Sequence, residues 1–328
     1  MIMALTEDGR KDRKPCKKPG NQATRDTMAR KWTVQDIPSQ KGKLAVVTGA
    51  NRGLGLEIVM GLARAGAHVV MAVRDPAKAT AAIGEVARLV PGAEVEAMTL
   101  DQADLASIRR FSDEFHKRFD RLDLLINNAS AILVPQSKTE DGFEKHIGVN
   151  HLGSFALTGL LLDRLTAAKG ARIVNTSSTA HRLVKDIDLD DLNCERAPYK
   201  PMDAYGKSKL AALLFNGELH RRLKKAGFDT LAVAAHTGYS NTNPDKGSFL
   251  MRLATSIFAQ PAAMGALPQL YAATAPDVAS GDYIGPGGMA EMRGYPAKVG
   301  CTPQAKNQAA AGRLWALSEK LTGVSFLD

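Results

Sequence analysis

Short runs of apolar residues alternate with helix-length segments along most of the chain after Gly42. The runs are rich in Val, Ile and Leu on both faces of a strand, which is typical of a parallel sheet that helices cover on each side. Right-handed crossovers join the strands of such a sheet. The sequence therefore predicts an α/β fold, a doubly wound domain with a central parallel sheet and helices on both faces. The predicted strands are 44–48, 68–73, 95–100, 122–126, 172–176 and 231–235, and the predicted helices are 54–65, 76–89, 105–119, 143–168, 204–226 and 303–321.

The first 30 residues lack this alternation. They have no hydrophobic period and are predicted to form a disordered basic extension ahead of a domain that spans 31–328. The 328-residue chain has a formal net charge of +9, and residues 1–43 supply two thirds of it, with eleven Lys or Arg against five Asp or Glu. The remaining charges nearly balance, so no nucleic-acid partner is expected. The extension is either without function or a basic binding arm.

The rest of the composition argues against several classes of protein. Cys16, Cys194 and Cys301 are far apart, so we expect a reducing compartment and no disulfide framework. His146 and His151 are five residues apart and no HExxH motif occurs, so no metal site is expected. No apolar stretch approaches 18 residues, and the N-terminus lacks the apolar region of a secretory signal. We therefore expect no transmembrane segment and a cytoplasmic location.

A glycine-rich turn, Gly49-Ala-Asn-Arg-Gly-Leu-Gly55, follows the first predicted strand. Glycines let the backbone turn tightly and approach a pyrophosphate, and the helix that follows offers free N–H groups and the positive end of its dipole. The GxxxGxG spacing alone also fits a plain strand-to-helix turn. Its position after the first strand of a βαβ pattern favours dinucleotide binding.

The end of the second predicted strand distinguishes the two nicotinamide dinucleotides. An NAD site places a carboxylate there to accept from the ribose 2′-hydroxyl, whereas this strand ends in Val73 and Arg74. Arg52 of the glycine turn can reach the same place, and two guanidinium groups suit a 2′-phosphate. The sequence favours NADP(H), unless both arginines are solvated surface side chains or the neighbouring Asp75 turns towards the ribose.

Tyr205 and Lys209 lie four residues apart in the segment Tyr205-Gly-Lys-Ser-Lys209, which places them on one face of a helix. A nearby ammonium group stabilises phenolate and lowers the pKa of tyrosine from about 10 towards neutrality, as acid/base catalysis at a carbonyl requires. The motif arises often by chance, and its other interpretation is a surface pair.

Taken together, these motifs resemble the short-chain dehydrogenase/reductase family over about residues 43–325. The resemblance implies a single Rossmann domain and an NADP(H)-dependent oxidoreductase that interconverts a carbonyl, in a ketone or aldehyde, and an alcohol. The matching segments are Thr48-Gly-Ala-Asn-Arg-Gly-Leu-Gly55, Asp101, Asn127-Asn-Ala129, Asn150, Ser177-Ser178, Tyr205 with Lys209, and the turn from Gly238 to Thr242. Val149-Asn-His-Leu-Gly153 and Asn175-Thr-Ser-Ser-Thr-Ala-His181 are similar to the retinol-dehydrogenase-like branch.

The resemblance also implies catalytic roles. Tyr205 would deliver the proton, Ser178 would donate to the substrate carbonyl, and Lys209 would bind the nicotinamide ribose and lower the pKa of Tyr205. Ser177 is a competing candidate for the serine that donates to the carbonyl, but Ser178 is the one that matches the retinol-dehydrogenase-like branch. Asn150 would either hold a water that links Lys209 to solvent or be a structural amide that kinks its helix.

The implied cofactor site is larger. Asp101 would accept from the adenine amino group, and Asn128 would either contact the adenosine side or tie adjacent strands together. The implied cofactor-binding residues are Gly49, Asn51, Arg52, Gly53, Leu54, Gly55, Arg74, Asp101, Asn128, Tyr205, Lys209, Gly238 and Thr242. One position departs from the family pattern: Thr237 stands where the family usually has proline, and we expect this to loosen the loop that carries nicotinamide contacts.

The substrate is a small molecule, and the loops after the strands are expected to contact it. In the substrate-loop region, about 238–268, apolar side chains predict an apolar ketone, aldehyde or alcohol, unless they only pack on the core or on a partner subunit. These side chains are Phe249, Leu250, Met251, Leu253, Ile257 and Phe258. A C=C reductase of the protochlorophyllide-reductase type and a non-catalytic NADP-binding module are alternative functions, and a homo-oligomer is left open.

Overall fold

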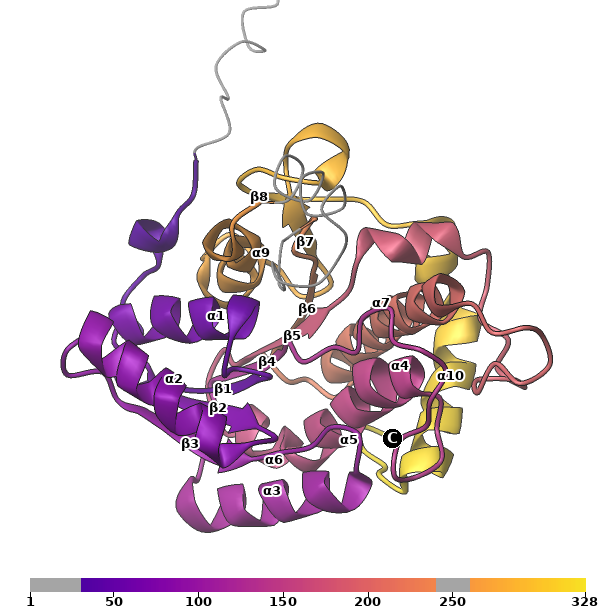
Figure 1. The fold of residues 1–328 in the computed structure, drawn as a ribbon, viewed down its shortest axis with the longest axis horizontal. Coiled ribbons are helices and arrows are strands. Elements are labelled where there is room, and N and C mark those ends of the chain that lie inside the picture. Colours follow the sequence, from indigo (N-terminus) through magenta and orange to yellow (C-terminus); the bar gives the residue numbers. More distant parts are fainter. Residues whose placement is uncertain (1–30, 240–259) are drawn as a thin grey trace, which may run out of the picture. The chain divides into compact units, whose positions relative to one another are not determined.

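An eight-stranded sheet forms the centre of the domain, in the order β3-β2-β1-β4-β5-β6-β7-β8 (Figure 1). The first seven strands in this order pair in parallel, and only β8 runs antiparallel. The computed structural model describes residues 31–239 and 260–328. The strands are β1 (Leu44–Thr48), β2 (His68–Val73), β3 (Val95–Thr99), β4 (Leu124–Asn127), β5 (Arg172–Thr176), β6 (Leu231–Ala235), β7 (Tyr283–Pro286) and β8 (Pro296–Lys298). The predicted doubly wound α/β fold is confirmed.

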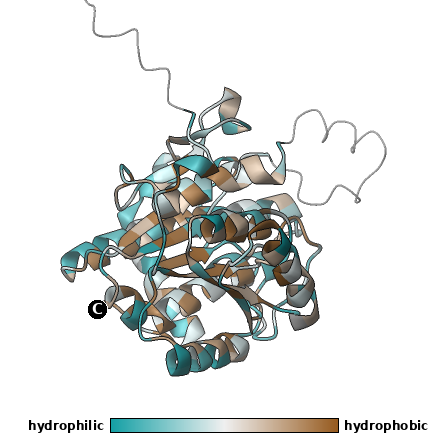
Figure 2. Cartoon of the chain, turned by 90° about the vertical axis from the view of Figure 1, so that its left-hand side faces the viewer, coloured by the Kyte–Doolittle hydropathy of each residue, from teal (hydrophilic) through white to brown (hydrophobic). Residues whose placement is uncertain are grey.

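Helices cover both faces of the sheet. Neighbouring strand residues point to opposite sides, so Val47 joins one apolar cluster with α1, α2 and α9, while Val46 joins another with α3, α5, α7 and α10. Figure 2 shows the apolar colour concentrated on the strands and the polar colour on the outer helices. The helices are α1 (Gly53–Arg64), α2 (Pro76–Leu89), α3 (Leu105–Arg118), α4 (Lys145–Ile147), α5 (Gly153–Leu160), α6 (Leu162–Thr166), α7 (Pro201–Lys225), α9 (Ala262–Thr274) and α10 (Gln308–Thr322).

Two predicted helices are interrupted. The predicted helix 143–168 is divided by a π-helical turn, η2 (Gly148–Leu152), and by a break at Leu161. The predicted helix 303–321 is a short 3₁₀ turn, η5 (Pro303–Lys306), followed by α10, because the side chain of Asn307 caps α10 by accepting from the N–H of Ala310.

The sequence analysis did not predict three elements near the C-terminus. Strands β7 and β8 have only four and three residues and contain Gly or Pro, which reads as turn sequence. Helix α9 contains Pro268 and begins within the predicted substrate-loop region, whose residues 262–268 are therefore helical. Residues 240–259, with Thr242 and the predicted apolar wall, lie outside the described residues, as does the predicted extension 1–30.

Within residues 31–239 and 260–328, no helix is both long and apolar enough to cross a bilayer. The same residues contain no group of three or more His, Cys, Asp or Glu side chains arranged to hold a metal ion.

Candidate active site

Helix α7 brings Tyr205 and Lys209 to the carboxyl edge of the sheet, one turn apart and on one face, as their spacing predicts. The Nζ atom of Lys209 lies 5.6 Å from the centre of the Tyr205 ring. A separate pocket of about 750 Å³ opens at the opposite edge, around the amino ends of β1 and β2, and contains neither residue. The candidate site is therefore at the edge where ligands of open α/β sheets bind.

Lys209 is almost fully buried, and its ammonium group contacts two oxygens. Nζ donates to Ser130 Oγ at 2.8 Å and to the carbonyl oxygen of Thr176 at 3.1 Å. Burial lowers the pKa of Lys209 to about 7, because the surroundings disfavour the charged form and no carboxylate compensates. The lysine is thus held in place and changes charge near neutral pH.

The predicted lowering of the Tyr205 pKa is not found in this structure. Burial raises the pKa of the Tyr205 phenol, and hydrogen bonding with Ser178 only partly opposes the rise. Lys209 is beside the ring, but its ammonium group donates to Ser130 and Thr176, so it does not stabilise the phenolate by a direct hydrogen bond. Tyr205 therefore holds its proton at neutral pH.

The two adjacent serines have different partners. Ser177 is buried and donates from Oγ to the carbonyl oxygen of Lys209 at 2.8 Å, so it ties strand β5 to helix α7. Ser178 is the N-cap of a 3₁₀ turn, η3 (Thr179–Leu183), where its Oγ accepts from Ala180 N at 3.2 Å. Its side chain is also close enough to the Tyr205 phenol to lower the pKa of that group. Of the two, Ser178 is the one beside the phenol.

Asn150 lies in the π-helical turn η2, and its side-chain amide bonds to the loop after β4 and to helix α7. Oδ1 accepts from Ala131 N at 2.7 Å, and Nδ2 donates to Ala131 O at 3.0 Å and to Ser208 Oγ at 2.9 Å. These contacts fit the structural alternative for Asn150, and π-helical turns are frequent at functional sites. That Asn150 also holds a water near Lys209 stays a prediction.

The glycine turn has the geometry that a dinucleotide needs. Gly49 and Gly53 have φ of +66° and +55°, a conformation that glycine adopts without strain. A Cβ on Gly55 would overlap Gly49 O and lie 2.9 Å from Ala50 Cα. Arg52 is the N-cap of α1 and makes no side-chain cap hydrogen bond, so the first N–H groups of the helix are available to a phosphate. The turn, which also contains Asn51 and Leu54, therefore fits a pyrophosphate.

Asn128 ties adjacent strands together. Its Nδ2 donates to Thr48 O at 2.8 Å, and its Oδ1 accepts from Gln269 Nε2 at 3.3 Å. These bonds join the ends of β1 and β4 to α9, at the point where the strand order reverses. This is the second of the two interpretations of Asn128, and contact with adenosine stays a prediction.

Asp101 follows strand β3, with its carboxylate in a turn. Its Oδ1 accepts from Ala103 N at 2.9 Å, and its own N–H donates to Ser107 Oγ at 3.0 Å. The residue is half-buried, so the turn fixes its orientation without closing it off. Its contact with an adenine amino group stays a prediction.

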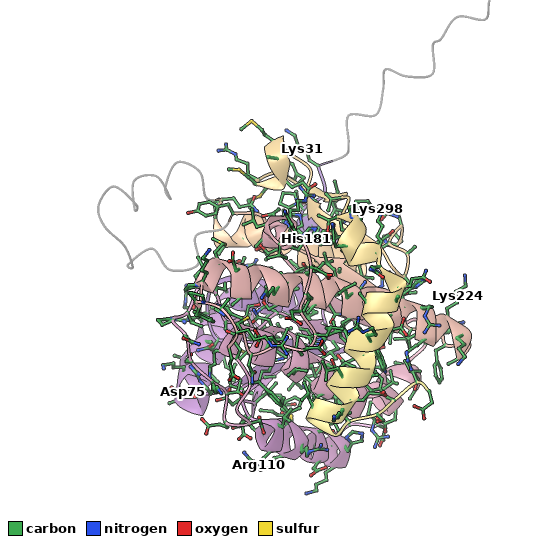
Figure 3. The ribbon with its side chains drawn as sticks, turned by 90° about the vertical axis from the view of Figure 1, so that its right-hand side faces the viewer. Lys31, Asp75, Arg110, His181, Lys224 and Lys298 are labelled. Carbon is green, nitrogen blue, oxygen red and sulfur yellow. The ribbon has the colours of Figure 1, made fainter. Side chains whose placement is uncertain are left out.

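The position that distinguishes NADP from NAD contains two exposed arginines. Within the described part of the chain, neither Arg52 nor Arg74 pairs with a carboxylate, and the buried Val73 provides no acceptor. Asp75 caps helix α2: its Oδ1 accepts from Ala77 N at 3.1 Å, and its Oδ2 lies 3.0 Å from Lys78 Nζ. The hydrogen bond from Lys78 lowers the pKa of Asp75. Asp75 lies at the edge of the domain (Figure 3).

The turn after strand β6 is held in place although Thr237 replaces the proline of the family pattern. Gln260 Nε2 donates to Thr237 O at 2.9 Å, and Tyr239 N donates to Met292 O at 2.9 Å. Gly238 has a φ of +62°, and a Cβ there would overlap Met292 O. At the described residues of the turn, side-chain and backbone contacts supply a restriction in place of the proline. The loop beyond Tyr239 lies outside the described residues, so its loosening stays a prediction.

Ser130 and Ser208 were missed by the sequence analysis. Ser130 accepts from Lys209 Nζ, and Ser208 Oγ donates to Tyr205 O at 2.7 Å while it accepts from Asn150. Both lie next to motifs that the sequence did reveal, Ser130 just after Asn127-Asn-Ala129 and Ser208 within Tyr205-Gly-Lys-Ser-Lys209. Adjacency to a motif was the only signal that could have identified them.

A glycine turn suited to a pyrophosphate and a serine, tyrosine and lysine beside it define a nicotinamide-dependent oxidoreductase of the Rossmann type. A family model described as short chain dehydrogenase matches residues 43–187. The chain is 39% identical to mouse (Mus musculus) retinol dehydrogenase 12 over 290 residues, which cover 87% of this chain and 88% of that protein. It is also 39% identical to human (Homo sapiens) retinol dehydrogenase 13 over 294 residues, 86% of this chain and 85% of the relative.

Solved structures agree with these relatives. The crystal structure of an uncharacterised protein from Mycobacterium paratuberculosis is 44% identical, with a TM-score of 0.76 over 90% of this chain and 98% of that one. The NADP complex of RhlG from Pseudomonas aeruginosa is 25% identical, with a TM-score of 0.57 over 75% of this chain and 94% of that one. The chain belongs to the short-chain dehydrogenase/reductase family, and both relatives described above are retinol dehydrogenases.

Proposed function

We propose that the protein is an NADP(H)-dependent oxidoreductase that interconverts a ketone or aldehyde and the corresponding alcohol on an apolar substrate. The observation that carries this proposal is the arrangement of Ser178, Tyr205 and Lys209. The Ser178 side chain is close enough to the Tyr205 phenol to lower its pKa, and Lys209 is beside the Tyr205 ring. Two hydroxyl groups can thus converge on one carbonyl oxygen.

Each of these residues has a separate role at the carbonyl oxygen. Tyr205 keeps its proton because burial raises the pKa of the phenol, so at neutral pH it can donate to the oxygen of a carbonyl as it becomes an alkoxide. Ser178 donates to the same oxygen and stabilises its developing negative charge. A nicotinamide cofactor supplies the hydride when it is bound. Lys209, at a distance of one helical turn, places a positive charge near the phenolate that proton transfer leaves behind.

The orientation of Asp75 supports the choice of NADP(H). A carboxylate that accepts from a ribose 2′-hydroxyl is the mark of an NAD site, but Asp75 is turned to its own helix and to Lys78. Arg52 and Arg74 are exposed nearby and suit a 2′-phosphate, to which guanidinium groups bind strongly.

Replacement of the phenol tests the proposed reaction. The Tyr205→Phe variant should lose at least about a hundredfold in turnover of an aldehyde or ketone, because the proton donor is gone, while cofactor affinity is retained. Tyr271→Phe is the matched control. Tyr271 lies on helix α9 outside the proposed site, and its hydroxyl donates to Asp277. Turnover would be followed by NADPH oxidation across a panel of aldehydes, ketones and enones, and cofactor affinity by fluorescence titration.

Near-native turnover of Tyr205→Phe on a substrate that the wild type reduces would contradict the mechanism. Reduction of enones alone would favour the C=C reductase, and cofactor binding without any turnover would favour the non-catalytic module. Fractionation of cells that express the full chain would test the further expectation of a cytoplasmic location.

A further inference from the structure

Exposed apolar side chains lie at the carboxyl edge of the sheet, the edge at which Tyr205 is found. Among the described residues, eight large hydrophobic side chains are exposed. Only two of them, Leu89 and Phe228, lie elsewhere. The other six follow strands β4 to β7 or immediately precede Tyr205: Ile132, Leu133, Leu183, Met202, Tyr239 and Met289. Exposed apolar side chains that cluster in this way are a sign of a binding surface.

Ile132 and Leu133 are neighbours in the loop after β4, and hydrogen bonds fix the chain on both sides of them. Their exposed fractions are 48% and 47%. On one side, the N–H and C=O groups of Ala131 both bond the amide of Asn150. Asn150 in turn bonds Ser208, whose hydroxyl donates to Tyr205 O. Ala131 is thereby linked through Asn150 to Ser208 of helix α7, the helix that contains Tyr205.

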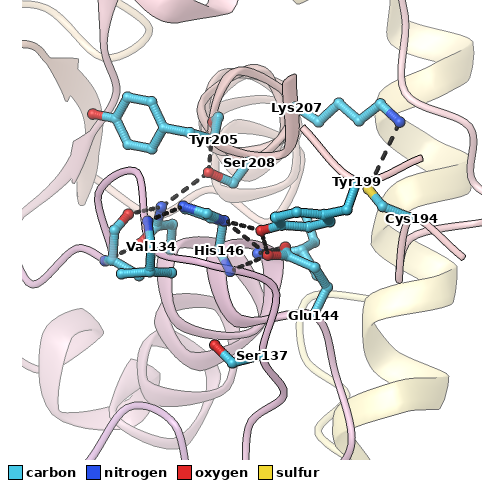
Figure 4. Close-up of polar contacts among 12 residues, drawn as sticks. Val134, Ser137, Glu144, His146, Cys194, Tyr199, Tyr205, Lys207 and Ser208 are labelled. Carbon is cyan, nitrogen blue, oxygen red and sulfur yellow. Dashed lines mark hydrogen bonds and ion pairs between the residues drawn. The ribbon is translucent and has the colours of Figure 1, made fainter. Parts of the chain in front are cut away.

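On the other side, a buried polar cluster fixes Val134. The N–H of Val134 donates to Nε2 of His146 at 3.2 Å, so Nδ1 of this imidazole has the proton and donates to Glu144 Oε1 at 2.8 Å. Tyr199 OH donates to the same carboxylate oxygen at 2.8 Å. Figure 4 shows His146 between Val134 and the Glu144–Tyr199 pair, below Tyr205. The His146 and Tyr205 rings meet edge to face, with 5.9 Å between centroids.

The backbone between these two anchors is strained at Leu133, whose φ is +49°. This conformation is uncommon for a residue with a Cβ and costs about 1 kcal/mol or more. Nothing in the local sequence favours it, because neither glycine nor asparagine occupies the position. The anchors at Ala131 and Val134 therefore hold two apolar side chains in an exposed, strained arrangement that solvent alone would not favour.

We propose that Ile132 and Leu133 are specificity-determining residues that contact the hydrocarbon part of the substrate. The proposal rests on the proposed carbonyl reduction. The anchors on both sides of the pair connect it to Tyr205, one through Asn150 and Ser208 and the other through the His146 ring. The distance from the reacting carbonyl to these side chains is thus fixed, and an alkyl chain attached to that carbonyl covers them when it binds. The chemical class recognised is a carbonyl compound with an extended apolar chain.

Linear aldehydes of increasing length, from propanal to decanal, provide the test. In the wild type, kcat/KM should rise with chain length. The variants are Ile132→Ser and Leu133→Asn, and asparagine tolerates positive φ, so the second variant keeps the backbone conformation. Each should lower kcat/KM for decanal by about tenfold or more, the discrimination that lost apolar contacts produce. The kcat/KM for propanal and the KM for NADPH should stay unchanged, and the Tm should not fall. Leu89→Ala is the matched control, a leucine of similar exposure at the end of α2.

The proposal would be overturned if the variants lost kcat/KM equally on propanal and decanal, or lost none on either. It would also be overturned if kcat/KM of the wild type did not depend on chain length. If the wild type reduces no carbonyl compound, the proposed function fails instead. Calorimetric titration with 1-decanol separates the two cases, because its binding needs the apolar contact and no reaction. Binding that Leu133→Asn weakens supports the contact, and binding that both variants leave unchanged overturns it.

Discussion

The orientation of one carboxylate at the end of β2 bears on the proposed choice of NADP(H). Asp75 follows Arg74 directly, and in sequence it was the residue that opposed NADP(H). In the structure it caps α2 and pairs with Lys78, so the group that would bind a 2′-hydroxyl has other partners. Capping of this kind is favourable in its own right, which explains why the carboxylate turns to the helix.

We predict that Arg74→Ala weakens NADPH binding far more than NADH binding. A hydrogen bond to a charged group contributes about 1.5–3 kcal/mol, so one lost contact to the 2′-phosphate should weaken NADPH binding about tenfold or more. Arg88→Ala is the control, because it removes the same charge from the far end of α2. Titration of each variant with both dinucleotides measures the effect. Equal losses for both, or a wild type that prefers NADH, would show the assignment to be incorrect.

Among the helices, glycines in α1 and α2 have opposite roles. A Cβ at Gly55 in α1 would overlap the backbone of Gly49, whereas no atom lies within 4 Å of a Cβ at Gly84 in α2. The first glycine allows the turn and the helix to approach each other closely, and the second only adds flexibility to the unfolded chain.

We predict that Gly55→Ala lowers the free energy of unfolding by about 1–3 kcal/mol, the usual range for overpacking, and weakens NADPH binding. Gly84→Ala should raise the free energy of unfolding by about 1 kcal/mol, the difference in helix propensity between the two residues, and leave binding unchanged. Urea denaturation and fluorescence titration measure the two effects. A Gly55→Ala protein as stable as the wild type would contradict the close approach.

The elements that the sequence predicted are those with long and regular patterns. Strand β1 is apolar on both faces and α7 is long, so both were assigned within a few residues. Strands β7 and β8 were missed because they are short and depend on the edge of an existing sheet for their pairing. The π-helical turn at Gly148–Leu152 was missed because its side chains keep a helical spacing, and its cause is tertiary, in the contacts of Asn150 with Ala131 and Ser208.

The candidate site was predictable where its residues form a local motif. Tyr205 and Lys209 are joined by one helical turn, and Gly49 to Gly55 by one loop. The cluster of Glu144, His146 and Tyr199 joins segments more than 50 residues apart, and no sequence period reports such a contact. Likewise, the pKa of Tyr205 depends on burial, which the spacing of tyrosine and lysine does not reveal.

Across the whole domain, a buried histidine joins the π-helical turn to the C-terminal helix. His151 Nε2 lies 2.8 Å from Ser318 Oγ on α10, and Ser318 donates its own proton to Leu314 O. Nε2 is therefore the protonated nitrogen and the donor, while Nδ1 is buried without a partner. Burial lowers the pKa of His151 to about 3, since a proton on Nδ1 would be left without an acceptor.

Because of this histidine, the free energy of unfolding of the whole domain depends on pH. Between pH 6.5 and about 3, the unfolded chain binds a proton at His151 that the folded protein does not, so the free energy of unfolding falls as the pH falls through this range. One such group contributes a slope of about 1.4 kcal/mol per pH unit. His151→Gln keeps a donor for Ser318 but does not titrate. Between pH 6 and 4, the slope of its free energy of unfolding against pH should therefore be smaller by about this amount. The variant also loses ring contacts with Phe155 and Phe215, which lowers its stability at pH 7. Urea denaturation at half-unit pH steps measures both slopes, and identical slopes would mean that His151 takes up a proton in the folded protein.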